Sequence, residues 1–184
     1  MTHKHFCTQA LLVTATLLAA ACTTDSLPAG QGQGGTEAIS LWAEIDQIPV
    51  TRASDDGFAD GDRMGVYVVD YQGDQPGTLL LSGNRADNVR HTYDATTGKW
   101  TASTTIFWKD KHTHADVYGY YPFTLPQSIS AYAFTVQANQ NSAPEGGKLG
   151  GYEASDFLWG NASDMAPTTD RVRLAMRHRM ARRG

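Results

Sequence analysis

The sequence has almost no cysteine and no long apolar segment. Cys7 and Cys22 are the only cysteines among 184 residues, so no disulfide can form within the chain after Cys22. The part of the chain after Cys22 therefore depends on its hydrophobic core alone. The apolar run Ala10–Ala21 has 12 residues, whereas a membrane-spanning helix needs about 20. A disulfide framework and a stable transmembrane span are both excluded.

The sequence also lacks the short patterns of the commoner enzyme classes. It contains no G-x-S-x-G, H-E-x-x-H, phosphate-loop or dinucleotide-binding pattern. His112 and His114 have a spacing that chelates metals on a strand, but they lie in a charged stretch without a third ligand. Four acids do not have the calcium-loop spacing and indicate turns: Asp55, Asp56, Asp60 and Asp62. We predict no catalytic residue, no metal, no cofactor and no enzymatic activity.

Positive charge is scarce except at the end of the chain. The net charge is −4, yet residues 171–184 hold six arginines and no acid. The nine other lysines and arginines face all 19 acidic residues. An acidic body of this kind argues against a nucleic-acid partner.

The N-terminus has the pattern of an export signal. Lys4 supplies a positive charge, and the run Ala10–Ala21 has the length of a signal-peptide core. Small residues directly before Cys22 are what a bacterial lipoprotein signal peptidase requires. We predict a lipoprotein signal peptide at 1–21, lipidation of Cys22, and a flexible Gly-rich tether at 22–37 that joins the body to a membrane. An ordinary signal peptide with an incidental cysteine is the alternative.

The body reads as β-structure because apolar residues recur mainly at every second position. The segment 115–121 carries aromatic side chains on both faces, which favours a central strand, and Gly119 leaves room for a close neighbour. Further expected strands and hairpins are 39–45 with an extension to Val50, 66–71, 89–100, 131–138 and 156–159.

The basic segment 171–183 has two interpretations. A basic amphipathic helix is one of them. The period of two is the better fit, because Val172, Leu174 and Met176 fall on one face and the arginines on the other. We therefore predict a strand with an arginine face, and place His178 at the edge of the core.

Five motifs in this order resemble the N-terminal domain of the fimbrillin family, the major and minor fimbria (type V pilus) proteins of gut and oral anaerobes. They are the lipoprotein signal with its tether, TRA at 51–53 before FADGDRMGVY at 58–67, DVYGYYPF at 116–123, YEASDFL at 152–158, and VRLAMRHRM at 172–180.

The resemblance implies an all-β, transthyretin-like antiparallel β-sandwich of about seven strands, here residues 38–184. A second such domain normally follows, and its absence here indicates a truncated chain or a fragment. The resemblance also implies assembly at the outer membrane and cell surface. By this resemblance, an arginine-specific protease would cut after Arg52 and remove the first strand, Ile39–Val50. Another fimbrial subunit would then donate a strand in its place.

Other roles remain open from the sequence. Some members of the family are uncleaved anchors or tip adhesins. A surface glycan-binding lipoprotein is a further alternative, based on the aromatic side chains of Trp42, Trp100, Trp108 and Tyr120. Four tryptophans in a β-sandwich are more often core and rim residues.

Overall fold

The computed structural model describes residues 37–46, 57–143, 145–146 and 148–179. Cys22 and Arg52 lie outside these residues, as do the predicted signal peptide, all but the last residue of the predicted tether, and the expected extension of the first strand to Val50.

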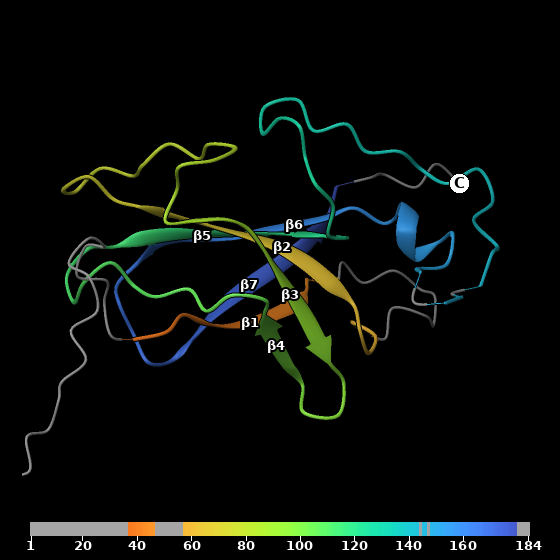
Figure 1. Cartoon of the computed structure of the whole chain (residues 1–184), viewed down its shortest axis with the longest axis horizontal. Coiled ribbons are helices and arrows are strands. Elements are labelled where there is room, and N and C mark those ends of the chain that lie inside the picture. Colours follow the sequence, from red (N-terminus) through yellow and green to blue (C-terminus); the bar gives the residue numbers. More distant parts are fainter. Residues whose placement is uncertain (1–36, 47–56, 144, 147, 180–184) are drawn as a thin grey trace, which may run out of the picture. The chain divides into compact units, whose positions relative to one another are not determined.

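The described part of the chain forms seven strands and one short 3-10 helix (Figure 1), which confirms the all-β class. The elements are β1 (Ser40–Ile45), β2 (Arg63–Asp70), β3 (Ala86–Asp94), β4 (Lys99–Ala102), β5 (Ala115–Tyr121), η1 (Glu153–Ser155), β6 (Leu158–Met165) and β7 (Arg171–His178). Among these residues no helix is long and apolar enough to cross a membrane.

The strands follow one hydrogen-bonded order, β1-β7-β6-β5-β2-β3-β4. β5 is the middle strand, as its two-sided aromatic pattern predicts, with β2 and β6 antiparallel on its two sides. The predicted hairpin at 89–100 is present as the antiparallel pair of β3 and β4.

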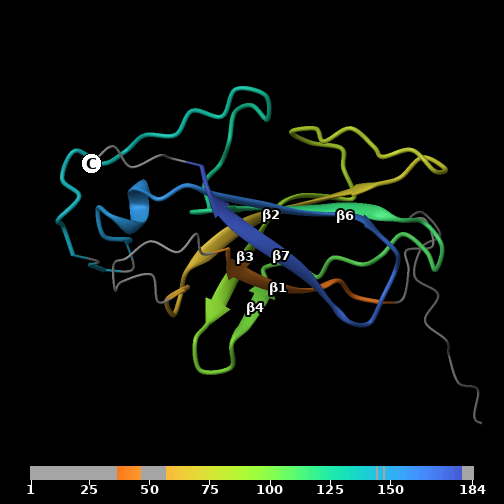
Figure 2. The same ribbon diagram turned by 180° about the vertical axis from the view of Figure 1, so that it is seen from behind.

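The structure differs from the predicted antiparallel sandwich in two ways. All seven strands belong to one sheet order, and β1 lies parallel to β7, which makes the sheet mixed. Figure 2 shows these two strands side by side. A parallel pair needs a long connection, and here most of the domain lies between the two strands. The alternation of residues reveals the face of a strand but not its direction.

The core lies on one face of β5 and is completed by β7. Gly119 of β5 faces Leu174 and Met176 of β7, and Val117 lies on the same face of β5. The side chains of Val117, Leu174 and Met176 are fully buried. A Cβ at position 119 would lie 2.8 Å from the Leu174 Cδ1 atom. The expected close approach at Gly119 is therefore confirmed, and Leu174 makes it.

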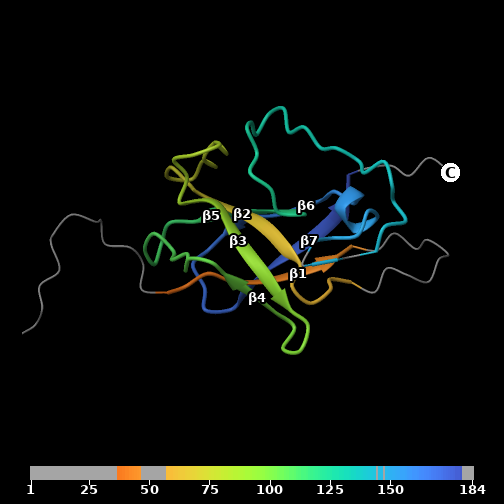
Figure 3. The same cartoon turned by 45° about the vertical axis from the view of Figure 1, so that its right-hand side comes forward.

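The strand predicted at 131–138 does not form. This stretch belongs to a long connection between β5 and β6 that passes over the strands in Figures 1 and 3. Its alternating aromatics contact Phe157 instead, since the ring centroids of Tyr132 and Phe134 each lie 5.1 Å from that of Phe157. A period of two can thus arise without a strand when rings on an irregular segment pack on one surface.

The contact at Gly119 gives a test of the core. Gly119→Ala is expected to destabilise the fold by about 1–3 kcal/mol because it overpacks the site. Leu174→Ala is expected to cost about 2–5 kcal/mol because it leaves a cavity beside position 119. In the double variant the added methyl fills part of that cavity. The double variant should therefore lose at least about 0.5 kcal/mol less unfolding free energy than the two single variants lose together. Urea unfolding of the four proteins measures this coupling, and strictly additive losses would contradict the packing.

Candidate functional site

The candidate site is the edge of the sheet where β1 lies against β7. The parallel register places Leu41 beside Val172, Ala43 beside Leu174 and Ile45 beside Met176. Leu41 and Ala43 are buried together with all three β7 residues. β1 thus contributes one row of apolar side chains to the core.

The opposite face of the same two strands carries a row of charge pairs. Arg173 donates from Nε to Glu44 Oε1 at 2.8 Å and also contacts this oxygen through Nη2. Arg177 donates from Nε to Asp46 Oδ2 at 2.9 Å. The hydrogen bonds from Arg173 lower the pKa of the Glu44 carboxyl and those to Glu44 raise the pKa of the Arg173 guanidinium. Both groups therefore stay charged across the physiological pH range.

Trp42 begins this outer row. Its indole Nε1 donates to Glu44 Oε2 at 3.1 Å, and the Arg171 guanidinium carbon lies 5.7 Å from the centre of the ring. Three arginines of β7 therefore lie against three alternate residues, Trp42 and Glu44 of β1 and Asp46 directly after it. Because these pairs are exposed, they contribute little to total stability. Their arrangement instead favours one register, since a slipped strand would lose its opposite charges.

Both ends of β1 have backbone partners. Ile39 N donates to Ile106 O at 2.8 Å, and Trp108 N donates to Glu37 O at 3.1 Å. At the other end, Asp46 N donates to Met176 O at 2.7 Å. The segment before β1 therefore lies antiparallel to residues 106–108, and a strand placed here is held by two different neighbours.

This site can bind a strand. An extended segment gains backbone hydrogen bonds from β7 and from residues 106–108, while alternate apolar side chains enter the core. β1 is the terminal strand of the sheet order, so its removal would leave the other six strands paired as they are.

The aromatic residues named for a glycan site lie in different places. Trp100 and Trp108 are core residues, 8% and 1% exposed, so they offer no surface to a ligand. Trp42 is 43% exposed but belongs to the outer row of β1. Tyr120 lies on the face of β5 opposite Gly119, where its hydroxyl lies 2.7 Å from Asn88 Oδ1. The structure does not bring these four side chains together.

The two histidines do not share a partner in the described structure. His114 Nδ1 lies 2.6 Å from Asp164 Oδ1. Asp110 accepts hydrogen bonds from the Thr113 hydroxyl and from the backbone nitrogens of Thr113 and His112. These bonds lower the pKa of Asp110 to about 2. No group of three or more metal-ligating side chains occurs within the described ranges.

The acids near residue 60 take turn roles where the structure describes them. Asp60 Oδ1 accepts from Ala95 N at 3.1 Å, and Asp62 Oδ2 accepts from Ala59 N at 2.8 Å. Burial raises the pKa of Asp62, whose Oδ1 also accepts from the Tyr121 hydroxyl. Asp55 and Asp56 lie outside the described residues.

Sequence reasoning missed the pairing of Glu44 and Asp46 with the arginines of β7. Both halves of the signal are visible, because acids alternate with apolar residues at 39–46 and arginines do so at 171–179. Nothing in the sequence joins two segments that lie 129 residues apart. His178, expected at the edge of the core, is exposed and lies 2.7 Å from Asp156 Oδ1.

A family model described as fimbrillin-like matches residues 51–182 of the chain. The matched segment contains β2 to β7 and begins after the end of β1. No curated protein matches the chain.

Three solved structures that resemble this one come from Bacteroides. A proposed cell adhesion protein of Bacteroides ovatus is 19% identical with a TM-score of 0.48, and the match covers 77% of this chain and 52% of that one. A fimbrial protein of Bacteroides ovatus is 18% identical with a TM-score of 0.46, and the match covers 82% of this chain and 29% of that one. A proposed cell adhesion protein of Bacteroides uniformis is 18% identical with a TM-score of 0.44, and the match covers 77% of this chain and 47% of that one. This chain spans about half the length of these proteins or less.

The charge row gives a test of how β1 is held. Arg173→Glu is expected to lower the hydrogen-exchange protection of the β1 amides about two- to fivefold, because it places like charges opposite Glu44. The reversed pair, Arg173→Glu with Glu44→Arg, should restore most of the protection. In 1 M salt, where the screening length is about 3 Å, the difference should nearly vanish. Equal protection in all three proteins at low salt would contradict a role for this pair.

Proposed function

We infer that this chain, which belongs to the fimbrillin-like family, is a cell-surface fimbrial subunit that assembles by exchanging its first strand. The proposal includes a cut after Arg52 by an arginine-specific protease, release of the strand 39–50, and entry of a strand from another fimbrial subunit. The observation that carries it is that β1 forms a terminal strand whose apolar row is part of the core.

Energetics support the need for a replacement strand. Full burial of a Leu, Ile or Val side chain contributes roughly 1.5–3 kcal/mol. Loss of Leu41 and Ile39 and exposure of their buried neighbours would therefore remove a large share of the 5–15 kcal/mol by which domains of this kind are typically stable. The groove left behind would include Val172, Leu174 and Met176, which are fully buried while β1 is in place. A donated strand would cover these residues again.

The charge row supports selectivity for the donated strand. A strand in the place of β1 would meet Arg171, Arg173 and Arg177 on its outer face. Acidic or aromatic side chains at alternate positions would fit there, whereas basic side chains would be repelled. We propose that the donor strand repeats the pattern of β1, with apolar residues on the inner face and acids on the outer face.

We further propose the domain organisation and the location of the subunit. Residues 1–21 would form the signal peptide, 22–37 the tether and 38–184 the folded domain. A lipid on Cys22 would anchor the precursor in the outer membrane and thereby present the domain at the cell surface.

Proteolysis tests the exchange. Trypsin-like treatment of the folded chain is expected to cut after Arg52, after which a labelled peptide of residues 37–50 should enter the site of β1. Gel filtration with detection of the label measures this uptake together with any polymer. Arg52→Gln is the matched control that should resist the cut and take up no peptide. A peptide with Leu41→Asp should bind at least about tenfold more weakly, because a buried charge has no partner there.

A cut chain that keeps its own strand, takes up no peptide and stays monomeric would contradict assembly by strand exchange. That result would favour the second candidate within the family, an uncleaved anchor or tip protein, since β1 would then be a permanent part of the domain.

Lipidation is tested at its predicted residue. Cys22→Ala is expected to abolish incorporation of labelled palmitate and to move the chain from the membrane fraction to the soluble fraction. Cys7→Ala is the matched control, because Cys7 lies within the predicted signal peptide and should leave labelling unchanged. Labelling that survives Cys22→Ala would contradict the lipoprotein prediction.

A further inference from the structure

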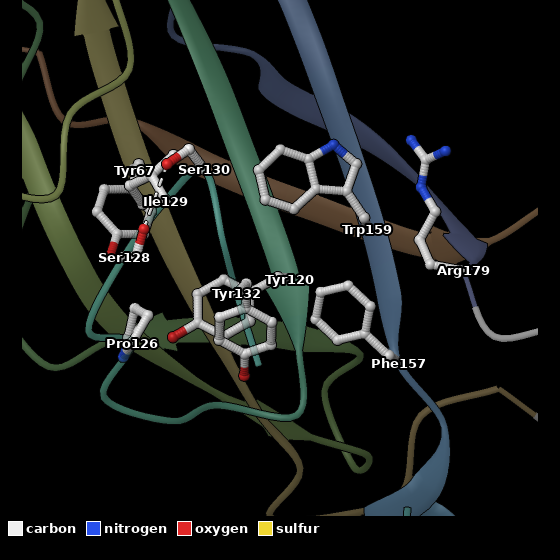
Figure 4. Close-up of a pocket in the computed structure, with 10 residues that line it drawn as sticks. All are labelled: Tyr67, Tyr120, Pro126, Ser128, Ile129, Ser130, Tyr132, Phe157, Trp159 and Arg179. Carbon is white, nitrogen blue, oxygen red and sulfur yellow. Dashed lines mark hydrogen bonds between the residues drawn. The ribbon is translucent and has the colours of Figure 1, made fainter. Parts of the chain in front are cut away.

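A pocket lies on the face of the sheet that is turned away from the core. It has a volume of about 390 Å³ and is formed by β2, β5 and β6 together with the long connection after β5 (Figure 4). This volume is at the lower end of the range of about 300–1,000 Å³ for sites of small molecules. Among the described residues, no residue of β1 or β7 lines the pocket, and Arg179, directly after β7, lies at its edge. The pocket is therefore a feature separate from the strand-exchange site.

The walls of the pocket are mainly aromatic and are held in place by one another. Tyr132 stacks on Phe157 at 5.1 Å between ring centroids, and Tyr120 meets Tyr132 edge-on at 5.8 Å. The Tyr120 hydroxyl lies 2.8 Å from Thr124 O, and the Tyr132 hydroxyl lies 2.6 Å from Thr124 Oγ1. These contacts fix the rings before any ligand arrives, so an aromatic wall is already formed.

A glycine on β2 makes room for this surface. Gly65 lies opposite Tyr120 in the antiparallel pair of β2 and β5, and a Cβ at position 65 would collide with the Tyr120 ring. The absence of a side chain there lets the ring lie against the strand. The position of Tyr120 in the pocket thus depends on a residue within the fimbrillin-like motif.

The pocket also contains one buried polar group that has no partner among the described residues. Tyr67 is 1% exposed and its hydroxyl makes no hydrogen bond. Buried hydroxyls almost always have a partner, so this one marks a place for an acceptor from a ligand. The hydroxyls of Ser128 and Ser130 also line the pocket and lie 3.4 Å from each other, a contact that Figure 4 marks with a dashed line. Burial raises the pKa of Tyr67 and raises that of Tyr120 to about 12, so both stay protonated at neutral pH.

Charge at the pocket has one sign only. Within the described part of the chain, Arg179 is the single charged residue that lines it, and no acid does. The Arg179 side chain is exposed and forms no ion pair with a described acid, in contrast to Arg173 and Arg177. In Figure 4 it lies beside Trp159 at the edge of the pocket. An aromatic site with an unpaired arginine disfavours cationic ligands and favours a carboxylate.

We propose that this pocket binds an acidic sugar residue, a single pyranose ring that carries a carboxylate. A pyranose has an apolar face of C–H groups that fits an aromatic wall, and hydroxyls at its edge that fit Tyr67, Ser128 and Ser130. Its carboxylate would pair with Arg179. A lipid chain would leave the serines and the arginine unused, and a quaternary ammonium would be repelled by the arginine.

This inference gives the glycan hypothesis a different set of residues. Of the four aromatics named from the sequence, only Tyr120 lines the pocket, and Trp159 supplies the indole. It does not rest on strand exchange, because loss of β1 would leave β2, β5 and β6 in place. A subunit with this pocket would attach to acidic glycans.

Titration with a matched pair of sugars tests the proposal. Methyl β-D-glucuronide and methyl β-D-glucoside differ only in the carboxylate, and each is added to the full chain while the indole N–H signals of the tryptophans are followed by NMR. The glucuronide is expected to shift the Trp159 signal, which Trp159→Phe identifies, and to bind about tenfold more tightly than the glucoside because of the charged pair.

Two variants and their controls locate the site. Arg179→Gln should make the two sugars bind equally, whereas Arg90→Gln, which removes an exposed arginine of β3, should not. Trp159→Ala should abolish binding, whereas Trp42→Ala should not, and thermal unfolding confirms that each variant is folded. Binding of neither sugar, equal binding of both to the unaltered chain, or unchanged binding by folded Trp159→Ala would each overturn the proposal.

Discussion

The apolar row that β1 shares with β7 is the contact on which the interpretation of this domain depends. Leu41, Ala43 and Ile45 lie in register with Val172, Leu174 and Met176, and the β7 residues are fully buried. β1 is the first strand of the domain and β7 is the last, so their contact joins segments that are separated by most of the chain. This noncovalent contact completes the core, and the proposed strand exchange would replace β1 with a strand of the same pattern.

The central strand shows how one element serves two surfaces. Gly119 faces the core and admits Leu174, while Tyr120, the next residue, faces the pocket. Two glycines without side chains create both surfaces, because Gly119 accommodates β7 and Gly65 accommodates the Tyr120 ring. The fold therefore uses close backbone approach on each face of the same sheet.

β7 links the two proposed sites. Its residues 171–177 contact β1 on both faces, and Arg179 directly after it reaches the edge of the pocket. The arginines that lie along one face of this segment therefore have different surroundings. Arg173 is paired with Glu44 of β1 and Arg177 with Asp46 directly after β1, whereas Arg179 has no acidic partner among the described residues. The same residue type thus supports strand register at one site and anion binding at the other.

The sequence by itself determined the all-β class, the central place of 115–121, the hairpin at 89–100 and the arginine face of 171–178. Each of these follows from the side-chain period of a strand, which fixes the two faces within a segment. Only the tertiary structure decided that β1 runs parallel to β7, that Trp100 and Trp108 lie in the core, that 131–138 forms no strand, and that Tyr67, Trp159 and Arg179 share a pocket. The physical reason is that the choice and direction of a neighbour depend on contacts between residues far apart in the chain, about which a local period carries no information.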